Sequence, residues 1–382
     1  MTDGGVLPAQ QIHKAIADDV IRADAAFEDG QVQPASLDLR LGGVAHRLRC
    51  SFVPGDDTVE TRLDDYSMET IDLSTGSGAI LERDRPYLIP LVEELRLPET
   101  TRARTNPKSS TGRVDVFCRV ITDHSHRFDE VAAGYDGRLW LEVVPRSFTI
   151  KVRAGLRLNQ LRLVTGREAL GDAELRALHA DEPVLWKAGV APEPDALVLA
   201  GGLFLGVDLT GSGSQGVGYK AKRNSKLLDL ADVRGHRAED FWEPVAAESG
   251  GRLVLEPEEF YLLISSERVR IPPAFAAEMT AYDPTAGELR THYAGFFDPG
   301  FGHRPAADGV QQGTRAVLEV RARDVPFMLE HGQSVCKLVY EPMLDEPDVL
   351  YGSDLASNYQ DQDLTLSKHF RPAGTQVGDI TH

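Results

Sequence analysis

Two glutamates occur in the same short pattern, in which one charged residue interrupts an apolar, strand-like run. Glu142 lies in a Leu-Glu-Val triplet within residues 139–164, and Glu319 lies in a second such triplet within residues 316–342. A carboxylate enclosed by apolar side chains has a raised pKa, which lets it accept and donate protons near neutral pH. Either glutamate is therefore a candidate general acid and base. The alternative is a glutamate on the exposed face of a half-buried strand.

A segment with serines and an arginine, KSSTGR, runs from Lys108 to Arg113. The hydroxyl of Ser109 and the guanidinium of Arg113 could orient a water molecule and offset negative charge that develops during a reaction. The same letters are also typical of a plain turn, because Ser and Gly are frequent in turns. The segment by itself therefore does not establish a site.

Both glutamates belong to an internal repeat. The interval from each of them to the glycine that precedes the next apolar run is the same. Residues 87–98 also align without gaps on residues 261–272, and Asp38 aligns on Asp208, at nearly the same offset. A long, nearly constant offset indicates a duplicated domain and not a short-period solenoid.

The length of 382 residues suits two domains of about 150 to 200 residues each. We predict a first domain at 1–165, a connector with a short helix at 166–195, a second domain at 196–345 and a tail at 346–382. The tail is polar, so it is either disordered or folds over a ligand.

The elements that must position these residues are mostly short strands. Leu37, Leu39 and Leu41 alternate with polar residues, which is typical of a half-buried strand, and residues 8–21 have the pattern of an amphipathic helix. We interpret the polar stretch 51–86 as a hairpin with loops. Further strands are expected at 87–92, 114–121, 138–144, 147–153 and 158–164. Many short strands separated by Pro and Gly predict a mainly β protein of barrel or sandwich type.

Composition limits the class of protein. A formal net charge of −18 argues against generic nucleic-acid binding, although Lys and Arg can still converge on one small polyanion. No apolar run reaches the roughly 18 residues that a membrane span needs, and no secretion signal is visible, so we expect a soluble, cytoplasmic protein without membrane contact.

Cys50, Cys118 and Cys336 are isolated from one another, which predicts buried, reduced thiols and no structural zinc site.

A glycine-rich segment from Gly211 to Arg223 is similar to a phosphate-binding loop in composition only. The GxxxxGK[ST] pattern is absent from it. We interpret the segment as a loop between strands.

Several segments resemble, in the same order, motifs of the dCTP deaminase branch of the dUTPase-like family. They are QPASLDLRLG, KSSTGR, the two Leu-Glu-Val triplets, AGFFDPGFG (Ala294 to Gly302) and, in the tail, NYQDQDLTLS. The resemblance implies distorted β-barrel or jelly-roll domains with a few short helices, assembled as a trimer with active sites between subunits. Members of the family deaminate dCTP to dUTP, hydrolyse dUTP to dUMP and diphosphate, or do both. This chain departs from the family pattern because it carries two copies of the domain.

The two copies are unequal. Where the first has KSSTGR, the second has YDPTAGELR (Tyr282 to Arg290), which lacks the paired serines; where the second has AGFFDPGFG, the first has an interrupted stretch. The resemblance implies that one subunit's serine-arginine segment meets the aspartate, glutamate and tail of a neighbour. We therefore hypothesise a composite site, with Glu142 as the alternative acid and base. Its members would be Ser109, Ser110 and Arg113 from the first domain, and Asp298, Glu319 and the tail from the second.

The resemblance also implies roles for these residues. Glu319 would move protons between water, N3 and the departing amine of cytosine, with Ser109 and Arg113 beside the attacking water. Asp298 would accept a hydrogen bond from the sugar 3′-hydroxyl. Ala294 and Gly295 would read the base edge, and Lys108, Ser109, Ser110, Tyr359, Gln362 and Lys368 would hold the triphosphate, with Mg²⁺ bridging phosphate oxygens.

The leading hypothesis is a hydrolase acting on the C–N bond of dCTP, without the His-x-Glu and Pro-Cys-x-x-Cys motifs of zinc deaminases. It would make dUTP and ammonia in pyrimidine deoxynucleotide metabolism. The rivals are a dUTP diphosphatase or bifunctional enzyme, and a nucleotide-binding regulator without catalysis. Phe301 after the turn aspartate, where diphosphatases of the family usually have tyrosine, favours deamination. We expect a homo-oligomer, with dTTP as an inhibitor.

Overall fold

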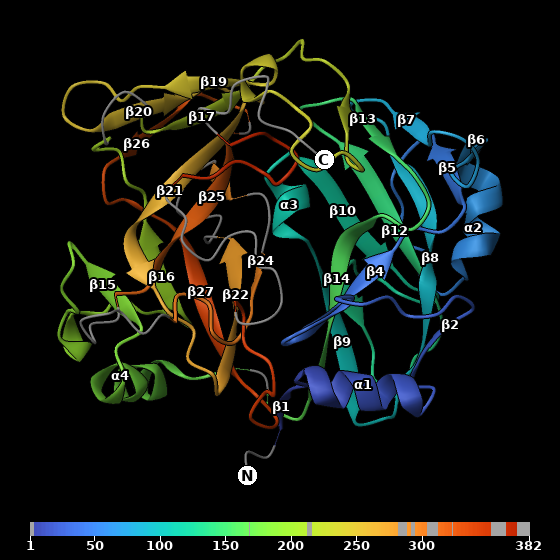
Figure 1. The fold of residues 1–382 in the computed structure, drawn as a ribbon, viewed down its shortest axis with the longest axis horizontal. Helices are drawn as coiled ribbons and strands as arrows, with labels where there is room; N and C mark the ends of the chain where they lie inside the picture. The colour runs from blue at the N-terminus through green and yellow to red at the C-terminus, as the bar shows by residue number, and fades with distance from the viewer. Residues whose placement is uncertain are drawn as a thin grey trace, which may run out of the picture.

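The computed structural model describes residues 4–167, 169–211, 216–281, 289–291, 295–303, 312–322, 324–352 and 364–372. Figure 1 shows two lobes of similar size, the first in blue to green and the second mainly in yellow to red. One large apolar core fills the first lobe and continues to residues of the second, such as Phe241 and Phe260, and another fills the second lobe. The prediction of a mainly β protein with two domains in tandem is confirmed.

The first domain contains two main sheets. One is built from β1 (Gly5–Val6), β3 (Val32–Gln33), β4 (Ser36–Arg40), β9 (Thr101–Pro107), β11 (Glu130–Val131) and β14 (Arg157–Thr165). The other is built from β2 (Ile21–Ala23), β5 (Val44–Leu48), β6 (Ser67–Asp72), β8 (Tyr87–Arg96), β10 (Val116–Ile121) and β12 (Asp136–Pro145). The strand orders are β11-β9-β14-β4-β3, with β1 beside β14, and β10-β12-β8-β5-β6, with β2 beside β8.

The second domain has the same plan. One sheet contains β15 (Leu185–Lys187), β17 (Gly218–Ala221), β19 (Trp242–Val245), β21 (Phe260–Val269), β23 (Leu289–Thr291) and β25 (Thr314–Ala322). The other contains β16 (Leu203–Gly206), β22 (Phe275–Ala281), β24 (Gly295–Phe297) and β27 (Ser334–Pro342), and β20 (Arg252–Leu255) pairs with β26 (Phe327–Glu330). The orders are β19-β17-β21-β25-β23 and β16-β27-β22-β24.

The repeat seen in the sequence is a repeat of topology. The order β10-β12-β8-β5-β6 corresponds strand for strand to β23-β25-β21-β17-β19, and β9-β14-β4 corresponds to β22-β27-β16. Even single hydrogen bonds recur. The Tyr87 hydroxyl accepts the backbone N–H of Glu82 at 3.0 Å, and the Tyr261 hydroxyl accepts that of Glu256 at 3.1 Å. The aligned segments are therefore equivalent strands.

Short helices complete the first domain. The predicted amphipathic helix is present as α1 (Ala9–Ala17), which buries Ile12 against the core. The stretch interpreted as a hairpin instead contains α2 (Val59–Tyr66), whose N-cap Thr58 accepts the N–H of Thr61 through its side chain at 3.2 Å. That capping bond satisfies an N–H that would otherwise have no partner at the start of a helix. β9 is a further strand that the pattern did not predict.

The predicted connector packs on the second domain. Its helix is α4 (Asp172–Asp181), with Leu175 in the second core, and β15 pairs with β21. A short 3₁₀ turn, Pro194–Ala196, follows before β16.

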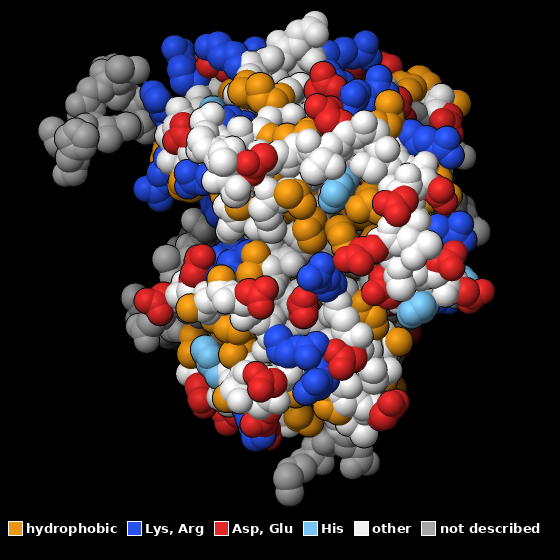
Figure 2. Space-filling model, turned by 90° about the vertical axis from the view of Figure 1, so that its right-hand side faces the viewer, with side chains coloured by type: hydrophobic (Ala, Val, Ile, Leu, Met, Phe, Trp, Pro, Cys, Tyr) orange, Lys and Arg blue, Asp and Glu red, His pale blue; other side chains and the backbone are white. Residues whose placement is uncertain are grey.

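The two domains meet over an extended boundary. β18 (Leu228–Asp229) of the second domain pairs in parallel with β13 (Ile150–Val152) of the first, which also pairs with β7 (Ala79–Leu81). Two arginines of the first domain form ion pairs with the second: the half-buried Arg104 with Glu278 and Glu341, and the fully buried Arg162 with Glu341. On the outer face of the molecule in Figure 2, basic and acidic side chains of the described residues are interspersed. None of the described helices is long and apolar enough to cross a membrane.

Candidate active site at the domain boundary

The serine-arginine segment forms one helical turn, α3 (Ser109–Gly112), at the edge of the first domain. The Lys108 carbonyl accepts the N–H groups of Thr111 at 2.8 Å and Gly112 at 3.0 Å, and the Ser109 carbonyl accepts that of Arg113 at 3.0 Å. Ser110, Thr111, Gly112 and Arg113 are buried. In Figure 1, α3 lies between the lobes and faces the second domain.

Glu319 of the second domain lies directly against this turn. It is in the middle of β25, and its carboxylate is so close to Gly112 that a Cβ on that glycine would lie 2.7 Å from Oε1 and closer still to Oε2. Arg113 is near enough to stabilise the charged carboxylate. One chain therefore brings together the two groups that the composite-site hypothesis pairs.

The environment of Glu319 favours its neutral form. Burial raises the pKa of Glu319 to about 8, with a further increase from the negative charge of Asp115, while the positive charge of Arg113 acts in the opposite direction. Protein atoms surround the carboxyl group on most sides, yet the residue keeps some solvent-accessible surface. At neutral pH Glu319 can thus hold a proton that it is able to donate.

Described residues of the tail cover the same turn. Arg113 donates through Nη1 to the Thr365 carbonyl at 2.8 Å, and the Ser367 hydroxyl donates to the Ser110 carbonyl at 2.7 Å. Phe370 then inserts between the domains, with its ring 5.4 Å from that of Phe241. These contacts hold residues 364–372 over α3.

Lysines gather beside the turn. Lys108 forms an ion pair with Asp38, which is almost fully buried on β4. Burial lowers the pKa of Lys368 in the tail, and the positive charges of Lys108 and Arg157 lower it further, against the opposing effect of Asp38. Because like charges are brought together here, this end of the site is suited to an anion.

Asp298 approaches Lys108 from the second domain. It follows β24, whose first residue is Gly295, and its carboxylate lies 3.5 Å from Nη2 of the fully buried Arg162. Burial raises the pKa of Asp298, Arg162 and Lys108 lower it, and Asp38 raises it further. Asp298, Lys108 and Lys368 therefore line one region that adjoins α3.

Glu142, the alternative acid and base, has a different environment. Its carboxylate is paired with Arg119 of the adjacent strand β10, from Nε to Oε2 at 2.9 Å, and Phe128 stacks on the guanidinium at 3.6 Å from the ring centroid. Trp140, two residues earlier on the same strand face, belongs to the cluster packed against α2. The face that carries Glu142 is thus covered by the first domain itself, whereas the face that carries Glu319 meets α3.

Comparison with known proteins identifies the family. The model of the 2′-deoxycytidine 5′-triphosphate deaminase (DCD) N-terminal domain matches residues 3–167, and that of the C-terminal domain matches residues 171–370. The chain belongs to the dCTP deaminase family. It is accordingly an enzyme that acts on a C–N bond, and the predicted tandem, dUTPase-like architecture of the family is confirmed.

A solved structure and several curated relatives agree. The chain is similar to the crystal structure of 2′-deoxycytidine 5′-triphosphate deaminase from Agrobacterium tumefaciens, with 46% identity, a TM-score of 0.82, and coverage of 91% of this chain and 100% of that one. A dCTP deaminase, dUMP-forming, from Methanoculleus marisnigri is 33% identical over 41% of this chain and 78% of its own. A dCTP deaminase from Aeropyrum pernix is 29% identical over 39% of this chain and 82% of its own.

Some residues of the candidate site were not predicted, and some predicted ones lie elsewhere. In the sequence, Asp38 is marked only by its place in the repeat and in one of the segments that resemble the deaminase family, and no motif marks Arg157 or Arg162. Phe301 is in the second core, 4.8 Å from Phe297 in ring-centroid distance, so it gives no information on sugar stacking. Ala294, Tyr359 and Gln362 lie outside the described residues.

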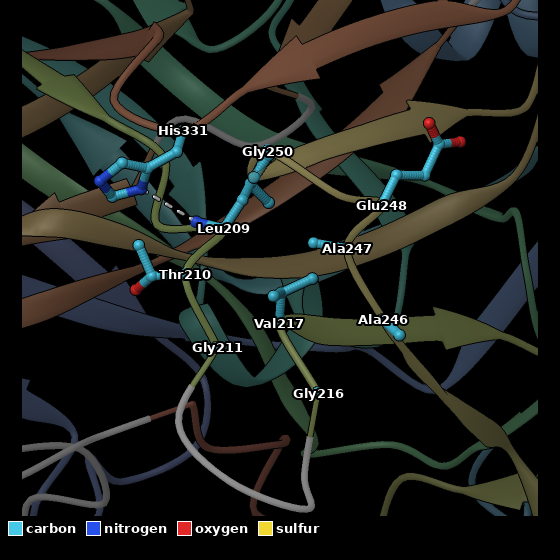
Figure 3. A pocket seen from close by; sticks show the side chains of 11 residues that line it. Leu209, Thr210, Gly211, Gly216, Val217, Ala246, Ala247, Glu248, Gly250 and His331 are labelled. Carbon is cyan, nitrogen blue, oxygen red and sulfur yellow. Dashed lines mark hydrogen bonds between the residues drawn. The ribbon is translucent and has the colours of Figure 1, made fainter.

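The glycine-rich segment lines a separate cavity of about 450 Å³ in the second domain. Figure 3 shows its small side chains and His331, whose Nδ1 accepts the N–H of Leu209 at 3.2 Å. No predicted site residue lines it. The part of the chain that the structure describes also has no group of three or more His, Cys, Asp or Glu side chains arranged to hold a metal ion.

Proposed function

We propose that this enzyme converts dCTP and water to dUTP and ammonia, with Glu319 as general acid and base. One observation carries the proposal: the Glu319 carboxyl group of one domain lies against Gly112 and near Arg113 of the other, and its pKa is raised to about 8. A carboxyl group that is protonated at neutral pH is suited to protonating a pyrimidine ring nitrogen.

The proposed reaction returns Glu319 to its starting state. Its proton passes to N3 of cytosine, and the carboxylate then takes a proton from the water whose oxygen forms a bond to C4. The same proton passes to the amine, the C4–N bond breaks, and the new hydroxyl returns a proton to Glu319 as the C4 carbonyl forms. Ser109 would orient the water, and Arg113 would stabilise negative charge on its oxygen.

The other residues of the candidate site are assigned to the triphosphate, the sugar and the base of the nucleotide. Lys108, Ser110 and Lys368 would hold the triphosphate, and Asp298 would accept a hydrogen bond from the 3′-hydroxyl. Gly295, with Ala294, would approach the base edge. Tyr359 and Gln362, inhibition by dTTP and assembly as a homo-oligomer stay predictions.

We expect Mg²⁺ to be held mainly by phosphate oxygens of the substrate, where it would neutralise their charge. Asp38 could help to hold the ion indirectly. Its Oδ1 is buried and has no hydrogen-bond partner among the described residues, so it could accept a hydrogen bond from a water molecule bound to the ion.

A second candidate activity is conversion of dCTP to dUMP. Several relatives, including those from Methanoculleus marisnigri and Sulfurihydrogenibium, are named as dUMP-forming. The two activities differ in diphosphate release and share the deamination step.

The direct test is to incubate the purified chain with dCTP and Mg²⁺, and separately with dUTP, while ammonia and diphosphate are measured independently. Ammonia without diphosphate would support dUTP formation, and equal amounts of both from dCTP would support the dUMP-forming reaction. Diphosphate from dUTP with no ammonia from dCTP would contradict the proposal.

The pH dependence of kcat/KM should report the unusual carboxyl group. Because the reaction begins with protonated Glu319, kcat/KM for dCTP is expected to fall as pH rises, with a midpoint near the folded-state pKa of about 8. Steady-state ammonia release over a range of pH would measure it. A value that stays level between about pH 6 and about pH 9 would show that Glu319 does not start the reaction as an acid.

A further inference from the structure

A buried charged cluster ties together the two segments that carry Arg113 and Glu319. Arg321 of β25 is ion-paired with Asp115 of the first domain, and the Ser147 hydroxyl donates to the same carboxylate oxygen, Oδ2. Asp115 is 0% exposed, Arg321 4% and Ser147 7%. The three side chains therefore form their contacts inside the domain boundary, away from water.

Arg321 and Asp115 each lie two residues from a group to which we assign a role in the reaction. Arg321 follows Glu319 by two residues on one strand, so both side chains leave the same face of β25 and point toward the first domain. Asp115 follows Arg113 by two residues, and its N–H donates to the Gly112 carbonyl at 2.8 Å. The ion pair of Asp115 and Arg321 thus joins the segment that carries Arg113 to the strand that carries Glu319, two residues away from each of them.

The backbone at Asp115 is adapted to this contact. Its φ is 55°, in the left-handed region that few residues other than glycine adopt, although Asp and Asn tolerate it. Its carbonyl accepts the N–H of Arg146 at 2.9 Å, and Arg321 also donates to the Glu258 carbonyl. Each partner of the Asp115–Arg321 ion pair is therefore held by a further hydrogen bond.

We propose that Asp115 and Arg321 are positioning residues for deamination: their buried ion pair sets the distance between Glu319 and the α3 turn with Arg113. They touch no substrate in this proposal, which rests on the proposed function of the site. Among the described residues, the charged groups that act on Glu319 are Arg113 and Asp115, and Arg321, on the same strand as Glu319, forms an ion pair with Asp115. Removal of one partner leaves the other as an uncompensated buried charge, which displaces both segments.

The test uses Arg321→Met, Arg321→Lys and Asp115→Asn in the full chain, with ammonia release from dCTP as the readout. Arg321→Met is expected to lower kcat about 100-fold, because small displacements of reacting groups have effects of that size, while KM changes less than about threefold. Arg321→Lys should recover part of kcat, since an ammonium group can still pair with Asp115.

Asp115→Asn gives a readout that a purely structural role would not produce. Asn fits the left-handed backbone, so the variant should fold, and loss of the negative charge that raises the pKa of Glu319 should move the alkaline fall of kcat/KM to lower pH. The matched control is Arg315→Met, which removes the ion pair of Arg315 with Asp208, 2.8 Å long, on the same strand but within the second domain. It should leave kcat and the pH profile unchanged.

The outcomes separate the two proposals. Absence of ammonia from dCTP with the wild-type chain would overturn the proposed function. An active wild type whose Arg321→Met and Asp115→Asn variants keep kcat and pH profile, or lose activity only as the Arg315→Met control does, would overturn the positioning role alone. If Arg321→Met does not fold, Asp115→Asn decides by its pH profile.

Discussion

Replacement of Glu319 by Gln is expected to lower kcat for deamination about 10³-fold, within the usual range for loss of a general acid and base. Gln has nearly the same shape as Glu and fits beside Gly112, but it cannot release a proton to N3 or take one from water. The measurement is ammonia release from dCTP under saturating conditions.

The variant should remain folded. In the unfolded chain Glu319 loses its proton around the ordinary value of 4.5, whereas the folded chain keeps it until about pH 8. The folded state therefore loses stability relative to the unfolded state as pH rises between these values, and Gln removes that loss. Thermal unfolding at pH 8 should show Glu319→Gln to be at least as stable as the wild type.

Glu142→Gln is the matched control, because Glu142 is the equivalent residue of the other repeat. It should weaken the contact with Arg119 and lower stability, but keep kcat within about threefold of the wild type. Full activity in Glu319→Gln, with loss of activity in Glu142→Gln, would transfer the catalytic role to the first-domain glutamate.

Replacement of Gly112 by Ala is expected to lower kcat/KM about 100-fold, the size of effect that a displacement of about 1 Å can produce. The new methyl group would lie 2.7 Å from Oε1 of Glu319 and 2.8 Å from its carboxyl carbon, which is closer than such atoms can approach. Either the carboxylate or the α3 turn must therefore move. Single-turnover and steady-state measurements with dCTP would show the loss.

Gly43→Ala is a suitable control for this variant. A Cβ at Gly43 would lie 3.7 Å from the nearest atom, the Cβ of Ser74, which is an ordinary contact distance. Deamination by this control should equal that of the wild type. Unchanged activity in Gly112→Ala would mean that Glu319 has room to rearrange without loss, and that its close packing against Gly112 does not matter for the reaction.

The repeat made most of the fold predictable. Its matched segments, such as Tyr87–Pro98 and Tyr261–Pro272, are rich in apolar side chains, and they became equivalent central strands because most of these side chains are buried. KSSTGR is intact only in the first copy and AGFFDPGFG only in the second, which suggests one site shared by both copies. Arg113 and Glu319 do meet across the domain boundary.

Other features depended on contacts between distant residues, which no local pattern reveals. The helix at Val59–Tyr66 has a polar sequence and is fixed by Thr58 and by packing of Val59 and Leu63 on the sheet. The pair of Asp115 and Arg321 joins residues of different domains. Phe370 is the single large aromatic residue near the end of a polar tail, and only its partners from other segments bury it.

Both halves of the described site are covalently joined. When two such surfaces belong to separate molecules, dilution separates them, whereas a peptide tether keeps them at a high effective concentration. Here Arg113 and Glu319 are part of one polypeptide, so dilution cannot separate the segments that carry them. Specific activity should consequently be independent of enzyme concentration down to the most dilute assays.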